Sequence, residues 1–347
     1  MMSNPPVTIN LVVLNGEKYI RYFLDSLKKQ TYPHDKIQFN ILDNGSIDNT
    51  VSIIESYKLQ ATSYKQVNFV KNKINLGMWP GQEELLKYTD GQYIIASAVD
   101  IILDKDFIRN SIEIMGKETK IGAIQAKIYK YDLVNNEPEL TNIIDTTGFK
   151  IFRSRRIINI GHGEEDNGQY DKLEEIFAVE GAVPIFRTEA FKSLKVSGEI
   201  TDHDYFWYGD DLDLAWRMQL FGWKQVFAPD VIAWHDRQTT KSVKKSWSDY
   251  ITRVPVRKQI PIQKRRLDWR NTRWTLIKND HIINILKDLP WIVLRETAVL
   301  GYTILFEPGV LKEIPKFFKH LPAMLRKRKE IMKRAVANPK DIRKWIN

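Results

Sequence analysis

The sequence predicts an α/β protein with a mixed central sheet flanked by helices and a helical C-terminal extension. Through the first hundred residues, apolar β-rich runs alternate with helix-compatible runs, which is typical of a parallel sheet covered on both faces. Later strands follow one another across polar loops, so the sheet is expected to become mixed. The expected strands are 7–14, 37–43, 67–72 and 92–100, and the expected helices between them are 16–30, 51–59 and 83–90.

The second half of the chain is expected to complete the sheet and then to become helical. Strands joined by a polar loop are predicted within 122–132 and within the segment that runs from 146–171 to 176–187, and a helix within 209–223. Residues 223–236 are interpreted as two short strands around Pro229. A basic polar linker over residues 236–270 is expected to lead to helices that continue to the end.

Composition excludes several classes of protein. The 347 residues include no cysteine, so a disulfide framework, a thiolate metal site and a cysteine nucleophile are all excluded. The N-terminal residues lack a basic leader followed by a long apolar core, so no secretion signal is predicted. We therefore expect a cytoplasmic protein, with peripheral attachment to the inner face of the cell membrane as an option.

The C-terminal region is basic and also rich in apolar and aromatic residues. The net charge is +10, and from Lys312 onward Lys and Arg outnumber Asp and Glu. This combination favours an anionic membrane surface over nucleic acid as a partner. Residues 289–311 contain three charged side chains and a Pro308-Gly309 break, so we expect them to lie on a surface and not to cross a membrane. A helical subdomain packed on the body, or a homo-oligomer formed through these helices, would use the same residues.

Polar residues follow the predicted strands where each strand ends. They are Asn15, Asp43, Asn75 and Asp100. Ligands of parallel α/β sheets bind at the carboxyl ends of the strands, where carboxylates can accept hydrogen bonds from a nucleoside or hold a divalent cation. A single such residue could simply cap a turn, but two carboxylates in neighbouring strands favour a site. Neither a dinucleotide fingerprint nor a P-loop motif is present.

His235 ends a short apolar run and is a candidate metal ligand together with Asp100. A structural role for a lone histidine is the alternative. In the stretch GDDLDLAWR, helical spacing puts Asp210 and Asp213 on one face and turns Asp211 about 100° away from Asp210. The three carboxylates therefore do not form a metal cage. A helix N-terminus favours an ionised carboxylate, which suits Asp210 or Asp211 to act as a general base; an acidic first helical turn is the alternative.

The chain resembles the family 2 glycosyltransferases of the GT-A fold, and within them the rhamnosyltransferase-like bacterial enzymes that build surface polysaccharides. The resemblance covers roughly residues 7–236. It implies a Rossmann-like nucleotide-diphospho-sugar transferase fold, with a catalytic domain over 1–240 and a basic helical region over 241–347. Within the catalytic domain, 1–118 would bind the nucleotide and 119–240 the acceptor. The segments that carry the resemblance include LDNGSIDNT, AVDIILDKDFI, VEGAVPIFRTEAF, FWYGDDLDLAWRMQLFGW and APDVIAWH.

The resemblance also implies an activity: inverting transfer of a sugar from a nucleotide diphosphate to a saccharide or lipid-linked acceptor in cell-surface polysaccharide synthesis. A dTDP-rhamnose or UDP-hexose donor is favoured, with Mg²⁺ or Mn²⁺ at the diphosphate. Asp211 would be the general base, Asp210 its neighbour, and Asp100 and His235 the metal ligands. Residues implied at the donor are Leu14, Asn15, Glu17, Asp43, Asn75, Gly77, Val99, Asp100, Gly181 and Ala182, and those at the acceptor are His162, Asp166, Trp207 and Tyr208.

The sequence departs from the family pattern at three places, one of which is Gln82-Glu83, where small residues or asparagine are common after the glycine-rich turn. Asp210 stands where glutamate is usual, and Ala98-Val99 precede Asp100 where polar residues are usual, so the metal site is expected to be lean. A nucleotidyltransferase of related fold is an alternative, but the segment after the first strand lacks the basic glycine-rich loop that a triphosphate needs. A catalytically decayed nucleotide-sugar-binding protein is a second alternative.

Overall fold

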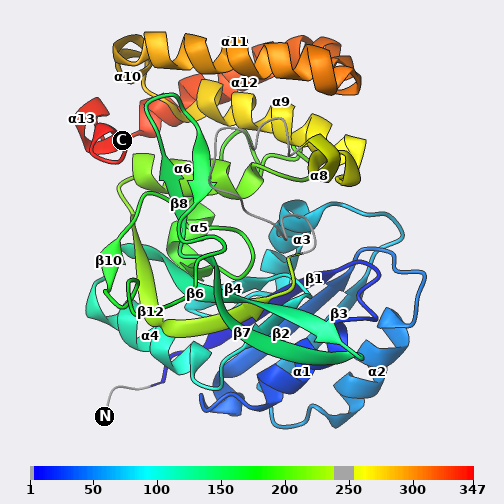
Figure 1. The fold of residues 1–347 in the computed structure, drawn as a ribbon. Helices are drawn as coiled ribbons and strands as arrows, with labels where there is room; N and C mark the ends of the chain where they lie inside the picture. The colour runs from blue at the N-terminus through cyan, green and yellow to red at the C-terminus, as the bar shows by residue number, and fades with distance from the viewer. Residues whose placement is uncertain (1–3, 238–253) are drawn as a thin grey trace.

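The computed structural model describes residues 4–237 and 254–347, and their centre is a large mixed sheet (Figure 1). Its first half is parallel, with β1 paired to both β2 and β4, and β2 paired to β3. This confirms the parallel sheet that the alternating pattern predicts. The strands are β1 (Val7–Val13), β2 (Ile37–Asp43), β3 (Gln66–Lys71) and β4 (Tyr93–Ser97).

The second half of the sheet is mixed, as expected. The short strand β11 (Ile185–Arg187) runs antiparallel between β4 and β6 (Ile121–Val134), and β6 pairs in parallel with β12 (Lys224–His235). At its far end β12 runs antiparallel to β5 (Ile101–Leu103), with His235 opposite Ile101. The remaining strands are β7 (Glu137–Thr146), which pairs with β6, β10 (Glu174–Glu175), which pairs with β12, and a separate hairpin of β8 (Phe149–Ile151) and β9 (Ile157–Asn159).

Two expectations about these strands are wrong. Residues 223–236 form one strand and not two, because the chain passes Pro229 as a bulge in which the register shifts between Ala228 and Ile232. Strand β7 was not predicted. It follows β6 through a turn in which Asn135 and Asn136 have φ of 52° and 61°, a conformation that asparagine tolerates in tight hairpins.

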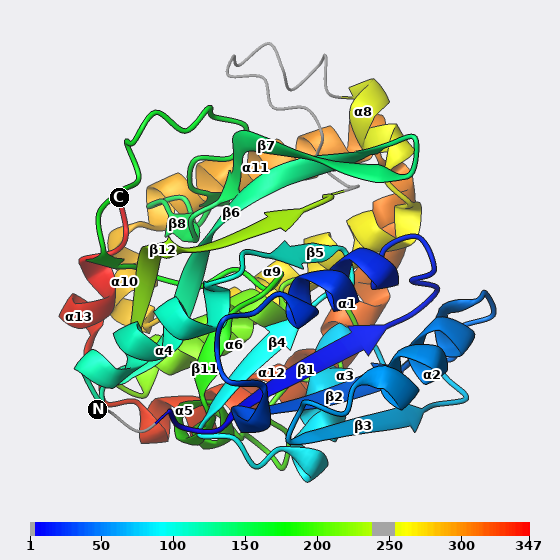
Figure 2. The same cartoon turned by 90° about the horizontal axis from the view of Figure 1, so that it is seen from below.

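Helices cover both faces of the sheet (Figure 2). One face carries α1, α2 and α4, and the other carries α3, α5 and α6, each through a separate apolar core. Helix α3 begins five residues before the predicted start at 83, because Gly77 ends the preceding loop. The helices are α1 (Ile20–Lys28), α2 (Thr50–Gln60), α3 (Met78–Leu85), α4 (Phe107–Lys117), α5 (Thr188–Ser193) and α6 (Asp210–Leu220), with single turns η1 (His34–Lys36) and η2 (Leu86–Tyr88).

The C-terminal helices form a layer against α6 and share its core. Ile331, Ile342 and Ile346 are buried in the same apolar cluster as Trp216 of α6. The expected linker over residues 236–270 falls partly on residues 238–253, which lie outside the described residues. Its later part is helical and contains α8 and the beginning of α9, so the expectation of a linker that extends to residue 270 is wrong. The elements are α8 (Val254–Gln259), α9 (Ile262–Asn279), α10 (Ile282–Lys287), α11 (Leu289–Phe306), η3 (Pro308–Glu313), α12 (Ile314–Arg334) and α13 (Pro339–Arg343).

Candidate active site

The loops after β1 and β2 are joined by side-chain hydrogen bonds. Asn15, at φ 50°, accepts from the Ile47 N–H at 2.9 Å, and its own N–H donates to the Ser46 hydroxyl at 2.8 Å. Glu17 accepts hydrogen bonds from the Asn49 side chain and backbone N–H at 2.7 and 3.1 Å. These contacts hold two predicted donor residues, Asn15 and Glu17, at one edge of the sheet. Leu14 beside them is exposed.

Asp43 closes β2 with its side chain buried. Its carboxylate accepts from the backbone N–H groups of Gly45 and Ser46 at 3.1–3.2 Å, and so shapes the loop that leads to α2. Asn75 organises the next loop in the same way, accepting from the Gly77 N–H at 2.8 Å. The predicted nucleoside-binding residues thus lie in three successive loops at the carboxyl edge of the parallel strands.

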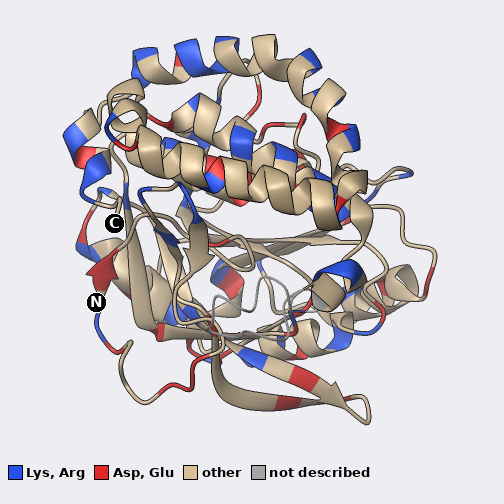
Figure 3. Cartoon of the chain, turned by 45° about the horizontal axis from the view of Figure 1, so that its top comes forward, with Lys and Arg blue, Asp and Glu red and all other residues tan. Residues whose placement is uncertain are grey.

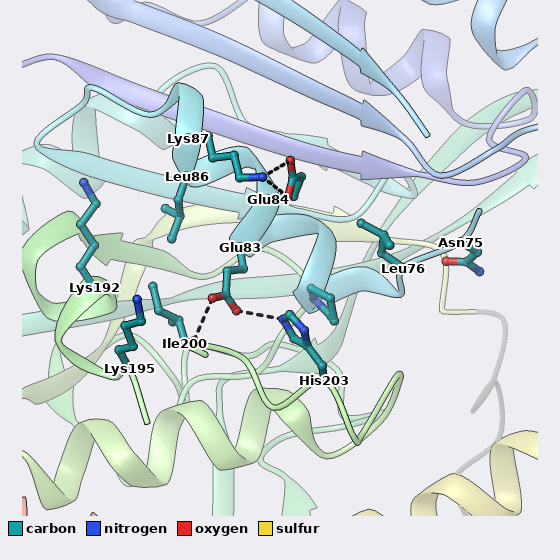
Figure 4. Close-up of a pocket in the computed structure, with 11 residues that line it drawn as sticks. Asn75, Leu76, Glu83, Glu84, Leu86, Lys87, Lys192, Lys195, Ile200 and His203 are labelled. Carbon is teal, nitrogen blue, oxygen red and sulfur yellow. Dashed lines mark hydrogen bonds and ion pairs between the residues drawn. The ribbon is translucent and has the colours of Figure 1, made fainter. Parts of the chain in front are cut away.

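A pocket of about 850 Å³ opens on the outer side of α3 (Figure 4). Of the predicted donor residues it contains Asn75. In its wall, Glu83 accepts from the Ile200 and Thr201 N–H groups at 3.0 Å and faces His203 at 3.2 Å. These contacts fix the segment that precedes the 203–209 loop, so α3 is connected to the approach to α6.

The pairing of β5 with β12 brings Asp100 and His235 together. Oδ2 of Asp100 lies 3.4 Å from Nε2 of His235, and Nδ1 of His235 lies 2.9 Å from Oδ2 of the buried Asp145. Burial would lower the pKa of His235, but the carboxylates of Asp100 and Asp145 raise it to about 10. Burial would raise the pKa of Asp100, yet the charge of His235 holds it below its usual value.

Arg237 continues this chain of charges towards the acidic helix. Its Nε donates to both oxygens of Asp145 at 2.8 and 3.0 Å, and its Nη2 donates to Glu180 at 2.8 Å. Burial would raise the pKa of Asp145, but Arg237 and then the two neighbouring histidines, His162 and His235, hold it well below its usual range. Asp145 is therefore a fixed negative charge between two cations.

Asp210 and Asp211 begin α6, and burial dominates their charge state. Burial, and then the Glu180 carboxylate, raise the pKa of Asp211 to about 7, against the lowering effects of the Leu212 N–H and Arg237. Burial and the neighbouring Asp211 raise the pKa of Asp210 well above its usual value. The expectation that the helix N-terminus keeps Asp210 ionised is therefore wrong, because desolvation outweighs the helix dipole. Asp211 changes charge near neutral pH.

Gly181 gives Asp211 the space that it needs. A Cβ atom at residue 181 would lie 2.8 Å from Cβ and 3.0 Å from Oδ2 of Asp211. The next residue, Ala182, accepts from the Ala98 N–H at 3.0 Å, two positions before Asp100. The predicted donor-sugar residues Gly181 and Ala182 therefore lie between Asp211 and the segment of Val99 and Asp100.

The loop before α6 is held by a side chain of α9. Nδ2 of the buried Asn271 donates to the carbonyls of Tyr205, Trp207 and Tyr208 at 3.1, 2.8 and 2.7 Å. Tyr208 has φ of 67°, so its backbone is in the left-handed region. The loop also meets Gly77, where a Cβ would lie 2.2 Å from the Phe206 carbonyl oxygen. Asn271 therefore fixes the chain that leads into Asp210.

The four predicted acceptor residues lie in two places. The rings of Trp207 and Tyr208 are in contact, with centroids 4.5 Å apart and planes tilted by 43°, and Nζ of Lys264 lies 4.1 Å from the centroid of the Tyr208 ring. Burial lowers the pKa of Lys264 to about 8. The other two come from the loop after β9: His162 Nδ1 lies 2.8 Å from the Asp145 carbonyl oxygen, whereas Asp166 binds Lys127 and Tyr129 of β6.

Asp213 has a structural role, in agreement with its predicted position on the Asp210 face. Its carboxylate binds Arg217 at 2.8 Å, Lys278 at 2.9 Å and Asn279 at 2.7 Å, all in buried positions. Burial would raise its pKa, but Arg217 and Lys278 hold it below the usual value. These contacts join α6 to α9.

Asp100 and His235 fit a divalent cation in partnership with a diphosphate. Oδ2 of Asp100 and Nε2 of His235 face one another, and the carboxylate of Asp145 binds the other ring nitrogen of His235. A carboxylate in this position orients an imidazole that binds a metal. Within residues 4–237 and 254–347, no group of three or more His, Asp or Glu side chains could hold a metal. Asp100 and His235 are therefore the two protein ligands that such a cation would have here.

Residues 8–188 match the family Glycosyl transferase family 2. The match covers more than half of the chain. The chain belongs to this family. The expectation of a glycosyltransferase with a GT-A-like mixed α/β fold is thereby confirmed, whereas the match to the family does not address the sugar that is transferred.

The curated relatives are distant and longer than the matched region. The chain is 28% identical over 120 residues to putative glycosyltransferase EpsH of Bacillus subtilis, covering 35% of this chain and 33% of EpsH. It is 24% identical over 223 residues to beta-monoglucosyldiacylglycerol synthase of Synechocystis sp., covering 63% of this chain and 41% of the synthase. The chain thus spans less than half the length of these relatives.

Solved structures share the fold over almost the whole chain. The mannosyltransferase PcManGT from Pyrobaculum calidifontis, in complex with GDP-Man and Mn²⁺, has a TM-score of 0.50 at 17% identity and covers 95% of this chain and 86% of its own. GalNAc-T7 with UDP, GalNAc and Mn²⁺ has a TM-score of 0.55 at 14% identity, covering 92% and 58%. At these identities the likeness shows the fold alone.

Four residues of the site were not predicted. Asp145 and Glu180 lie within the segments DTTGFKI and VEGAVPIFR, which were noted only for the resemblance, and Arg237 directly follows HD at the end of β12. Asn271 directly follows the expected linker, in the region expected to be helical. A partial signal existed in each segment, but the contacts join residues far apart in sequence.

Proposed function

We propose that this protein is an inverting glycosyltransferase that moves a sugar from a nucleotide diphosphate to an acceptor hydroxyl. The observation that carries the proposal is the set of contacts that runs from Asp100 and His235 through Asp145 and Arg237 to Glu180, whose charge raises the pKa of Asp211. One end offers oxygen and nitrogen ligands, and the other offers a carboxyl group that titrates near pH 7. A single displacement needs these two groups on opposite sides of the sugar.

The charge state of each residue determines its proposed role in the reaction. Asp211, when ionised, accepts the proton of the attacking hydroxyl, and neutral Asp210 beside it adds no competing negative charge. Gly181 keeps the carboxylate of Asp211 next to the backbone at 181–182. Asp100 and His235 would hold a divalent cation, which as a Lewis acid stabilises the charge that develops on the leaving diphosphate. Asp145 orients His235.

The donor and acceptor classes belong to the same proposal. Structural neighbours are complexes with GDP-Man and with UDP, which supports a nucleotide diphosphate donor. Of the possible nucleotide diphosphate sugars, we favour dTDP-rhamnose or a UDP-hexose. The relatives include a poly(ribitol-phosphate) beta-N-acetylglucosaminyltransferase of Staphylococcus aureus and the glycolipid synthase named above, which supports a role in surface polymer or glycolipid synthesis. The adjacent aromatic rings of Trp207 and Tyr208 would suit the apolar face of a sugar in the acceptor.

The test combines donor binding with turnover. Purified full-length protein is screened against UDP-, GDP- and dTDP-sugars with and without Mn²⁺, first by thermal shift and then by release of nucleotide diphosphate. We expect one donor class to stabilise the protein in a Mn²⁺-dependent way. The Asp211→Asn variant should keep this binding and lose about 10²–10⁴-fold in turnover. Absence of donor binding, or wild-type turnover by Asp211→Asn, would refute the proposal.

A further inference from the structure

Helix α11 presents its apolar side to the outside and its charged side to the protein. Its only charged residues, Arg295 and Glu296, face inward, and Glu296 binds Arg273 of α9 at 2.6 Å. On the opposite side Leu294 is 65% exposed and Leu305 is 73% exposed. This is the reverse of a surface helix in water, which turns its apolar stripe to the core.

The exposed apolar surface extends beyond α11. Ile282, Ile283 and Leu286 of α10 are exposed in the same layer, and Trp291 stands half exposed near the α10–α11 junction under Arg153. We call the exposed apolar residues of α10 and α11 the outer apolar face. Contiguous apolar surface of this kind marks a protein or membrane contact. Its members are Ile282, Ile283, Leu286, Leu289, Trp291, Val293, Leu294, Leu300, Ile304, Leu305 and Phe306.

Helix α12 adds a basic stripe on the same side of the molecule. Figure 3 shows α11 almost entirely tan and α12 marked with blue along its length. Six exposed positions of α12 share one side at helical spacing and combine two apolar side chains with cations. They are Phe318, Lys319, Leu325, Arg326, Lys329 and Lys333.

We propose that the outer apolar face and the basic stripe of α12 dock this protein on an anionic membrane, with α11 lying parallel to the lipid surface. Apolar side chains would enter the boundary between headgroups and acyl chains, while Lys and Arg pair with anionic headgroups. A second copy of the chain fits this surface less well, because two basic stripes would be brought towards each other.

The position of α11 argues for lying on a membrane and against crossing it. By length and composition α11 could cross a membrane, and little of it is buried. Yet the Arg273–Glu296 ion pair attaches its middle to α9, and Arg257 of α8 binds Glu307 just after its end at 2.7 Å. A spanning α11 would have to break the first pair and place Arg295 and Glu296 in hydrocarbon.

The test is flotation of the full chain with two kinds of vesicle, phosphatidylcholine alone and phosphatidylcholine mixed with phosphatidylglycerol. We expect the protein to float with the mixed vesicles at low salt and to be released by alkaline carbonate. The double variant Leu294→Glu with Leu305→Glu should abolish flotation. The matched control, Leu59→Glu with Val134→Glu, replaces exposed apolar residues on α2 and β6 and should float like wild type.

The basic stripe is tested separately with Lys319→Gln and Lys329→Gln. Each lost charge should weaken binding to the mixed vesicles about fivefold. Circular dichroism and melting temperature confirm that each variant is folded. The proposal is overturned if the wild type floats with neither vesicle, or if it resists carbonate, which would indicate a spanning helix. It is also overturned if the wild type sediments as a dimer that Leu294→Glu with Leu305→Glu dissociates without any vesicle binding. None of these readouts depends on sugar transfer.

Discussion

Asp145 binds the side of the His235 ring that points away from Asp100. Oδ2 of Asp145 lies 2.9 Å from Nδ1 of His235, and Nε2 of His235 lies 3.4 Å from Oδ2 of Asp100. The carboxylate of Asp145 also binds Arg237, which in turn binds Glu180 next to the Asp211 segment. One buried carboxylate therefore positions groups at both ends of the proposed reaction.

Replacing Asp145 by Asn should lower the affinity for Mn²⁺ more than it lowers the stability of the protein. An outer-shell partner of a ligating imidazole is worth about 10–100-fold in metal affinity, so the Mn²⁺ concentration for half-maximal donor turnover should rise by that factor. Asp166→Asn is the matched control, because Asp166 is a carboxylate bound to Lys127 and Tyr129. An unchanged Mn²⁺ dependence in Asp145→Asn would contradict the assignment.

The rate should rise with pH through about 7. The active form of Asp211 is the carboxylate, and burial with Glu180 raises its pKa to about 7, so the acid form dominates below that pH. The acidic limb of kcat/KM against pH should therefore have its midpoint near 7. Asp210→Asn mimics the neutral form of Asp210 and should leave this midpoint in place. A kcat/KM that does not change between about pH 5.5 and 8.5, the range in which a group with this pKa changes charge, would count against Asp211 as the base.

Glu180→Gln should move that midpoint to lower pH. Removing the negative charge of Glu180 relieves its repulsion of the ionised Asp211, while the positive charge of Arg237 remains to stabilise the carboxylate. The direction of the shift is the test, because a general loss of structure would lower kcat/KM at every pH without moving the midpoint of the acidic limb. The measurement is kcat/KM for nucleotide release across the same buffers. A midpoint that rises or stays near 7 would show that Glu180 does not set the charge of Asp211.

The sequence predicts the parallel half of the sheet because each strand there is a continuous apolar run followed by a polar loop. It does not predict β7, whose first residues, Glu137–Asn142, are mostly polar or exposed and are ordered by pairing with β6. The sequence pattern also places the first half of helix α9, residues 262–270, in a linker for a similar reason. Its buried Arg270 and Asn271 are polar residues whose partners lie in the 204–208 loop.

For the site, sequence reasoning proposed the groups and the structure supplies their connections. Asp100, Asp211 and His235 stand at strand or helix ends, which a pattern can locate. The contact of His235 with Asp145 crosses 90 residues, and no local pattern gives such a pair. The local pattern also does not give the charge state of Asp210, because the helix dipole acts locally whereas burial depends on the packing of the folded chain.

Asn271→Leu should reduce activity by loosening the loop before α6. The change keeps the number of side-chain heavy atoms but removes the donor of three hydrogen bonds, so the carbonyls of Trp207 and Tyr208 lose this partner and that of Tyr205 keeps only Arg270. We expect a loss of about 1–3 kcal/mol in stability and a fall in kcat. Asn284→Leu is the control: it removes one buried hydrogen bond, to the Pro339 carbonyl at 2.9 Å. Equal loss of kcat in both variants at matched melting temperature would reduce Asn271 to a purely structural residue.

Gly181→Ala should abolish turnover while the protein stays folded. The added Cβ would stand 2.8 Å from Cβ of Asp211, so the base must move away from the backbone at 181–182. Misplacing a reacting group by about 1 Å can cost 10²-fold in rate. Gly116→Ala in α4 is the matched control, since nothing lies within 4 Å of the added methyl, and alanine is favoured over glycine within a helix by about 1 kcal/mol. We therefore expect Gly116→Ala to keep full activity and an equal or higher melting temperature. Full activity in Gly181→Ala would mean that the base does not need its present position, and would separate Asp211 from the chemistry.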